Sequence, residues 1–148
     1  MRKLLAIALL LTVACTSTRA KSPVKSPSIR VVQTSGVPYV ARGVSGPVPV
    51  RYGMRVGNTA EVPITLKRVT IQSVGAGAYS LPSTTFPFDK AIAPGAHDDV
   101  EFWASAYVSD PTIVGANGPV TLRLIVHFDS PKGEFDEITV LQVNAGSR

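Results

Sequence analysis

The chain contains a single cysteine, Cys15, so it cannot form an internal disulfide. It contains only two histidines, His97 and His127, and it has no Gly-x-Ser-x-Gly motif that would present a nucleophilic serine. There is also only one tryptophan, Trp103. The sequence therefore lacks the framework of a disulfide-stabilised scaffold and offers few of the groups on which hydrolases depend.

The start of the sequence has the pattern of an export signal. Two basic residues, Arg2 and Lys3, precede the apolar segment 4–14, and Cys15 directly follows it. A membrane-spanning helix takes about 20 apolar residues, so this segment is too short to cross a bilayer. We therefore predict that residues 1–14 are a signal peptide.

Residues 11–15, with the sequence Leu-Thr-Val-Ala-Cys, resemble the lipobox of bacterial lipoproteins. Thr12 occupies the position where that family usually has leucine. The resemblance implies that Cys15 is the lipid attachment site and the first residue of the mature protein, which would be anchored to a bacterial membrane in the cell envelope. The alternative is an ordinary secretory signal cleaved after Ala20, which would release a soluble protein without the cysteine.

Residues 15–27 are expected to form a flexible, lipidated tether. They are rich in serine, proline and lysine, and Lys-Ser-Pro occurs at 21–23 and again at 25–27. Such a composition favours an extended and solvated backbone. Residues 28–148 have the length of one domain, which we predict to carry the fold.

The net charge of +5 does not indicate a nucleic-acid partner. Five of the 15 basic residues lie in residues 1–27, so the ten that remain equal the ten acidic residues, all of which lie after residue 27. A nucleic-acid-binding domain is expected to carry a basic stripe on its folded part. We predict no nucleic-acid partner, and expect contact with the membrane through the lipid anchor and with an envelope protein.

Beyond the tether, apolar residues recur at every second position, which is typical of strands with one buried face. Gly- and Pro-rich segments separate the apolar runs, and no helical period is present. Strands are expected at about 29–34, 37–42, 50–56, 62–73, 78–82, 100–107, 120–128 and 135–143. This pattern predicts an all-β fold, an immunoglobulin-like antiparallel β-sandwich of about seven to nine strands.

The alternation changes phase within residues 62–73. Ile64 and Leu66 share one face of the strand, whereas Val69 and Ile71 fall on the other. We predict a β-bulge at this point, or a strand that changes sheets.

Residues 52–58 and 62–66 are similar to the paired strands of the late-embryogenesis-abundant type 2 domain. In that family an alternating strand ends in asparagine, as it does here at Asn58, and the next strand packs apolar residues. Thr59 stands where the family usually has proline. The similarity continues through residues 92–95 and 99–108, and it implies a β-sandwich with a stress-protective or binding role.

The two histidines do not indicate a catalytic site. His127 falls on the outward row of its strand, and His97 precedes Asp98 and Asp99 without a third metal ligand at suitable spacing. The acidic segment 129–137 lacks the order of an EF-hand loop. We predict no catalytic residue, no metal and no cofactor, and hence a protein that is not an enzyme. An envelope hydrolase using either histidine, and a soluble exported stress-protective protein, are the alternatives.

Trp103 and Tyr107 are the candidate binding residues. They lie on one side of the 100–107 strand, opposite Phe102, Ala104 and Ala106. A large indole is rarely left exposed in a monomer, so we expect Trp103 to face the core. In the opposite orientation Trp103 and Tyr107 would form an exposed aromatic pair, and such pairs mark binding surfaces. The sequence thus favours a non-catalytic binding or structural module.

Overall fold

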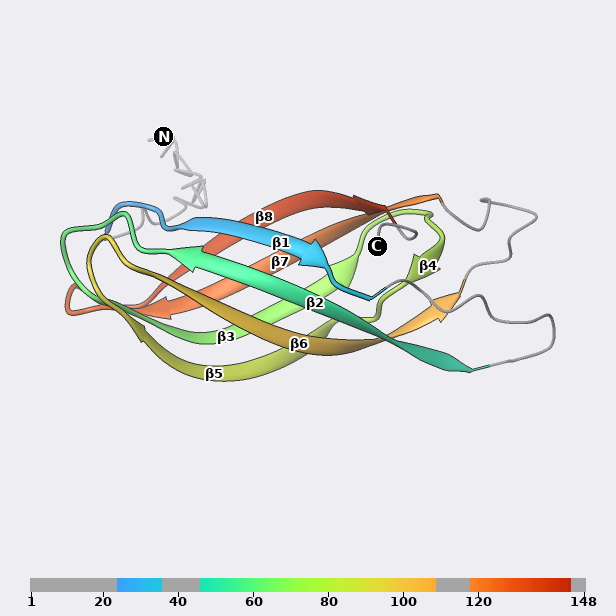
Figure 1. Cartoon of the computed structure of the whole chain (residues 1–148), viewed down its shortest axis with the longest axis horizontal. Coiled ribbons are helices and arrows are strands. Elements are labelled where there is room, and N and C mark those ends of the chain that lie inside the picture. The colour runs from blue at the N-terminus through green and yellow to red at the C-terminus, as the bar shows by residue number, and fades with distance from the viewer. Residues whose placement is uncertain (1–23, 36–45, 109–117, 145–148) are drawn as a thin grey trace, which may run out of the picture.

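The computed structural model describes residues 24–35, 46–108 and 118–144, and all regular structure within them is β-strand. Two antiparallel sheets pack face to face (Figure 1), which confirms the predicted β-sandwich. The strands are β1 (Ser28–Gln33), β2 (Pro47–Gly57), β3 (Ile64–Ser73), β4 (Tyr79–Ser80), β5 (Thr84–Ile92), β6 (His97–Val108), β7 (Pro119–Asp129) and β8 (Phe135–Asn144). The predicted signal peptide, Cys15 and the strand predicted at 37–42 lie outside the described residues.

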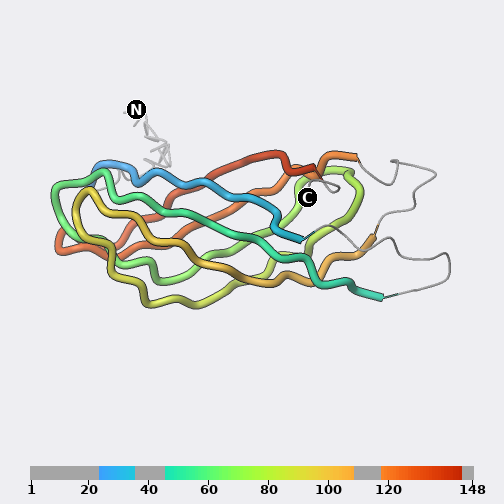
Figure 2. Tube along the Cα trace, in the orientation of Figure 1, coloured from blue at the N-terminus to red at the C-terminus, as the bar shows by residue number. Residues whose placement is uncertain are grey.

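The order of the strands is β1-β2-β6-β4 in one sheet and β5-β3-β7-β8 in the other. In an immunoglobulin domain strands A, B and E share one sheet opposite C, F and G. Here β1, β2 and β6 lie opposite β3, β7 and β8, which is the same arrangement. β1 and β8 are end strands on one side of the sandwich, while β5 is the end strand of its sheet on the other (Figure 2).

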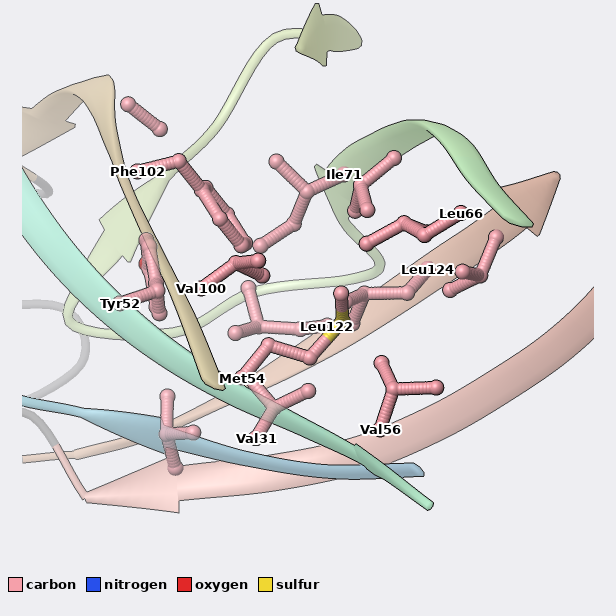
Figure 3. Close-up of a cluster of buried hydrophobic side chains, with 14 of the residues drawn as sticks. Val31, Tyr52, Met54, Val56, Leu66, Ile71, Val100, Phe102, Leu122 and Leu124 are labelled. Atoms are coloured by element: carbon pink, nitrogen blue, oxygen red, sulfur yellow. The ribbon is translucent and has the colours of Figure 1, made fainter. Parts of the chain in front are cut away.

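The core lies between the sheets and is built from alternate residues of each long strand (Figure 3). The predicted β7 row is confirmed, because its five inward side chains are at most 1% exposed. The row from β2 meets it from the opposite sheet. These two rows are Val120, Leu122, Leu124, Val126 and Phe128, and Val50, Tyr52, Met54 and Val56.

Residues 84–92 form a strand, β5, that the sequence pattern does not predict. Pro87 interrupts the segment, and a proline cannot donate a hydrogen bond within a sheet. β5 tolerates it because β5 is an edge strand that pairs only with β3. The predicted bulge is confirmed, since the register of β3 shifts between Leu66 and Arg68 against both β5 and β7. The strand expected at 78–82 is shorter, as β4 covers only Tyr79–Ser80.

The packed part of the chain includes residues before Ser28. Val24 is 8% exposed and belongs to the core cluster, and Pro27 is also buried. The Thr59 hydroxyl donates a hydrogen bond of 2.7 Å to the carbonyl oxygen of Ser26. Residues 24–27, which composition assigned to the tether, therefore lie against the sandwich.

Asn58 ties three segments together at one end of the sandwich. Its side-chain amide donates to the carbonyl oxygens of Val62 at 2.9 Å and Ile92 at 3.0 Å, and its side-chain oxygen accepts from the backbone N–H of Ala60 at 2.9 Å. Its own backbone N–H donates to the carbonyl oxygen of Ala96. Every polar group of this buried residue has a hydrogen-bond partner, so its burial does not incur the free-energy penalty of an unsatisfied polar group.

A buried chain of hydrogen bonds joins β4 to β2 and β1. The Tyr79 hydroxyl donates to Oε1 of Gln33 at 2.7 Å, so its oxygen accepts from the Tyr52 hydroxyl, also at 2.7 Å. Gln33 in turn donates to the carbonyl oxygen of Ser35 at 2.8 Å. Burial raises the pKa of Tyr79 to about 12, and burial together with the hydrogen bond to Tyr79 raises the pKa of Tyr52 as well.

We expect Leu124→Ala to lower the free energy of unfolding by about 2–5 kcal/mol, because it leaves a cavity at a fully buried position of β7. Val74→Ala is the matched control, since Val74 is 45% exposed. It should change stability by less than about 0.5 kcal/mol. If chemical denaturation showed the same decrease in the free energy of unfolding for both variants, the assignment of Leu124 to the core would be contradicted.

The tyrosine network makes the fold sensitive to alkali. Above the ordinary tyrosine pKa of 10.0 the unfolded chain loses these protons, whereas the native Tyr79 keeps its proton up to about pH 12. The stabilisation that comes from the raised pKa of Tyr79 is therefore fully present below pH 10, and it is lost as the pH rises towards 12. Chemical denaturation at a series of pH values should show this loss. The free energy of unfolding should fall less steeply with pH in Tyr79→Phe, because phenylalanine has no hydroxyl proton to lose. Identical slopes for Tyr79→Phe and the native protein would argue against the network.

Candidate binding face

The orientation of β6 is opposite to the one expected from the size of its tryptophan. Phe102, Ala104 and Ala106 are buried, whereas Trp103 is 51% and Tyr107 is 49% exposed. The expectation that Trp103 faces the core is therefore wrong. The alternating pattern itself is confirmed, and it places both candidate binding residues on the outer side of the sheet.

A cluster of aromatic rings determines this orientation. The ring of Phe102 lies 5.7 Å from that of Tyr52 in its own sheet, and 4.9 Å and 6.4 Å from those of Phe86 and Phe88 in the opposite sheet. Such ring pairs add about 0.5–1.5 kcal/mol each beyond the area they bury. Since Phe102 is held inward, its neighbour Trp103 must point outward.

Trp103 and Tyr107 belong to a wider surface formed by β2 and β6, which we call the binding face. In the register of the two strands Trp103 is opposite Arg51, and Tyr107 is opposite Pro47. Exposed Ser105 lies between the aromatic residues on the same side. The members of the binding face are Pro47, Pro49, Arg51, Gly53, Arg55, Asp99, Glu101, Trp103, Ser105 and Tyr107.

Arg51 stacks on the tryptophan. Its guanidinium carbon lies 4.0 Å from the centre of the Trp103 ring, within the range of a cation–π contact. The Nε atom of Arg51 is buried and has no hydrogen-bond partner among the described residues. The stack holds the planar guanidinium in one orientation beside the exposed indole, so the pair is a preorganised contact point.

Prolines protect the part of β2 that extends beyond β1. The register of β1 ends at the pair of Gln33 and Tyr52, and the backbone N–H of Arg51 donates to the hydroxyl oxygen of Ser35 at 2.9 Å on that side. Backbone nitrogens two residues apart in a strand point the same way. Pro47 and Pro49 therefore have no N–H donors on this side of β2, beyond the point where its described pairing with β1 ends.

A hollow of about 260 Å³ lies over Gly53, which has no side chain to fill the sheet surface, and the pair of Gly53 and Glu101 is next to the pair of Arg51 and Trp103 in the strand register. The methyl groups of Thr34 and Val32 lie 3.2 Å and 3.6 Å from the place that a Cβ atom at Gly53 would occupy. Small-molecule pockets span about 300–1,000 Å³, so this hollow has the size for one inserted side chain. Its lining residues are Arg30, Val32, Gly53, Met54, Arg55, Asp99, Val100 and Glu101.

Charges of both signs border the hollow. Arg55 and Asp99 form a bidentate pair across the strands, with two N–O distances of 2.8 Å. The hydrogen bond from Arg55 lowers the pKa of Asp99. Among the described residues Arg30 and Glu101 have no ion-pair partner, so both remain available to a ligand.

The structure does not bring the two histidines together, because His97 is in β6 and His127 is in β7 of the other sheet. His127 points outward, as predicted, and its Nδ1 contacts the carboxylate of Asp136 on β8. The Arg68 guanidinium lies 3.5 Å from the same nitrogen. The sequence pattern did not identify these partners, because they come from neighbouring strands.

Within the described ranges no group of three or more His, Cys, Asp or Glu side chains could hold a metal ion. The same ranges contain no helix that is long and apolar enough to cross a membrane.

No protein-family model matches the chain, and no curated protein matches it. Solved structures do resemble it in fold. A Northeast Structural Genomics Consortium target aligns with a TM-score of 0.55 at 9% identity, over 82% of this chain and 86% of that chain. A Bordetella pertussis protein given the name ApaA aligns with a TM-score of 0.51 at 16% identity, over 81% of this chain and 93% of that one. At these identities the likeness shows the fold alone.

The solution structure of a protein assigned to the late-embryogenesis-abundant group also aligns, with a TM-score of 0.46 at 16% identity over 80% of this chain and 71% of that one. A match at this TM-score carries no argument about function. The stress-protective role implied by the sequence resemblance stays a prediction.

Proposed function

We propose that this protein is a non-catalytic binding module of the bacterial cell envelope, which holds a protein partner on its binding face. The observation that supports this proposal best is the half-exposed Trp103, stacked on Arg51 beside the Gly53 hollow. Tryptophan, tyrosine and arginine are the residues most enriched at energetic hot spots of protein interfaces. The binding face carries all three.

The size and charge of the face also favour a protein over other ligands. The hollow is smaller than the usual pocket for a small molecule, but it can accept one side chain of a partner. The mixed charges of Arg30, Arg55, Asp99 and Glu101 do not form the basic stripe that nucleic acid requires.

Lipidation of Cys15 is the second part of the proposal. The lipobox-like segment 11–15 supports it, and a basic, Pro-rich segment follows the cysteine. A single acyl chain gives only marginal membrane binding, so stable anchoring takes more than one chain. Bacterial lipoproteins, which the leader resembles, carry two or three. Anchoring would confine the binding face to the membrane surface and limit its partners to envelope proteins.

The binding face is tested by photo-crosslinking. A photoreactive amino acid in place of exposed Ser105, between the two aromatic residues, should capture the partner in cells. With that partner purified, we expect Trp103→Ala to weaken binding by about 2 kcal/mol or more, a roughly 30-fold rise in Kd, because it removes the centre of the face. Gly53→Ala should also weaken binding, because the added Cβ atom occupies part of the hollow, and the Thr34 methyl group, 3.2 Å from that atom, has to move by only a few tenths of an ångström.

Thr85→Ala, on the outer side of the opposite sheet, is the matched control and should bind as the native protein does. Unfolding curves of the three variants separate lost binding from lost folding. Native affinity in Trp103→Ala would contradict the proposed face. Loss of a hydrolytic activity in the double variant His97→Ala and His127→Ala would instead support the alternative of an enzyme.

The anchor is tested by labelling cells with an alkyne fatty acid. The native chain should be labelled and Cys15→Ser should not, because only the thiol can carry the lipid. Mass spectrometry of the mature N-terminus is the second measurement. A mature chain that starts at Lys21 would show an ordinary secretory signal, and equal labelling of both proteins would show that the lipid is not attached to Cys15.

A further inference from the structure

Among the described strands, β8 is the end strand of its sheet, and its edge over Asp136–Gln142 can pair with another strand. β8 hydrogen-bonds to β7 on one side, and no described strand pairs with its other side. The N–H and C=O groups of such an edge can pair with a strand of another chain. Two side chains on its outer face, Ile138 and Val140, are 41% and 62% exposed.

β8 lacks the features that protect the other edges of this molecule. β4 has two residues, β1 has six, and β5 contains Pro87. β8 has ten residues and contains no proline, lysine or glycine. Short length, proline and lysine are the usual means by which edge strands avoid pairing. β8 is therefore the longest edge without such protection among the described residues.

We propose that β8 pairs antiparallel with β8 of a second copy of this chain, around a two-fold axis at Thr139. In this register Ile138 of each copy lies opposite Val140 of the other, on the same outer face. Directly opposed apolar side chains stabilise an antiparallel pair, and so does the central pair of threonines. β8 belongs to one sheet and the binding face to the other, so this pairing leaves the binding face free.

The charges of β8 favour this register. Its only charged residues, Asp136 and Glu137, lie at one end of the strand. Antiparallel pairing places them opposite Gln142 and Leu141 of the second copy. A parallel arrangement in register would bring like charges together, which is destabilising. In the antiparallel arrangement the Ile138 and Val140 side chains of both copies form one apolar patch across the two-fold axis.

Cysteine cross-linking of the full chain tests the pairing. Opposed Cα atoms in an antiparallel pair are about 4.5–5.5 Å apart, within the range that a disulfide spans. Under mild oxidation in membranes we expect Thr139→Cys to give a covalent dimer. Thr85→Cys, at an exposed position of edge strand β5, is the matched control and should remain monomeric, as should the native chain with Cys15 alone.

A second substitution separates stable pairing from chance collision. Adding Val140→Lys to Thr139→Cys brings two like charges close to the axis, and should lower the dimer yield by more than about tenfold. Val140 is 62% exposed, so the lysine is compatible with the folded monomer, which thermal unfolding verifies. A dimer yield unaffected by Val140→Lys, or equal dimer yields from Thr139→Cys and Thr85→Cys, would overturn the proposal.

Discussion

The inward packing of Phe102 is the interaction on which the rest of the molecule depends. Its ring contacts Tyr52 in its own sheet and Phe86 and Phe88 in the other, and so joins the two layers. Because side chains in a strand alternate, this contact also determines which residues of β6 reach solvent. A shift of β6 by one residue would bury Trp103 and Tyr107 and remove the binding face.

Two buried polar clusters keep this arrangement in place. Asn58 joins the end of β2 to the segments before β3 and β6, and the chain of Tyr52, Tyr79 and Gln33 joins β2, β4 and β1. Since all of these groups have partners, a displaced strand would leave several of them unpaired at about 1–3 kcal/mol each. The framework behind the binding face is therefore rigid. This rigidity suits a surface that binds without a large rearrangement.

The sequence predicted the features that depend on neighbouring residues along the chain. Alternation identified the rows of β2 and β7, and the change of phase after Leu66 identified the bulge. The expectation that Trp103 faces the core was wrong. It considered only the size of the indole, whereas the orientation of β6 depends on the contacts of Phe102 with Phe86 and Phe88 in another strand. The Gly53 hollow was missed for a similar reason.

The hollow exists because Val32 and Glu101 flank a glycine, and only the strand register brings these residues together. The contact between His127 and Asp136 likewise joins two strands. Features of this kind depend on pairing between distant segments. A single sequence contains the alternation within each strand but not the register between strands.

The exposure of Trp103 can be measured directly, because it is the only tryptophan in the chain. Fluorescence quenching of the native protein by acrylamide reports on this one side chain, with the unfolded protein as the reference for full access. We predict that acrylamide quenches the native indole readily, with a rate constant that is a large fraction of the value for the unfolded protein. A strongly protected, blue-shifted indole would show that Trp103 is buried, and would contradict both the orientation of β6 and the binding face built on it.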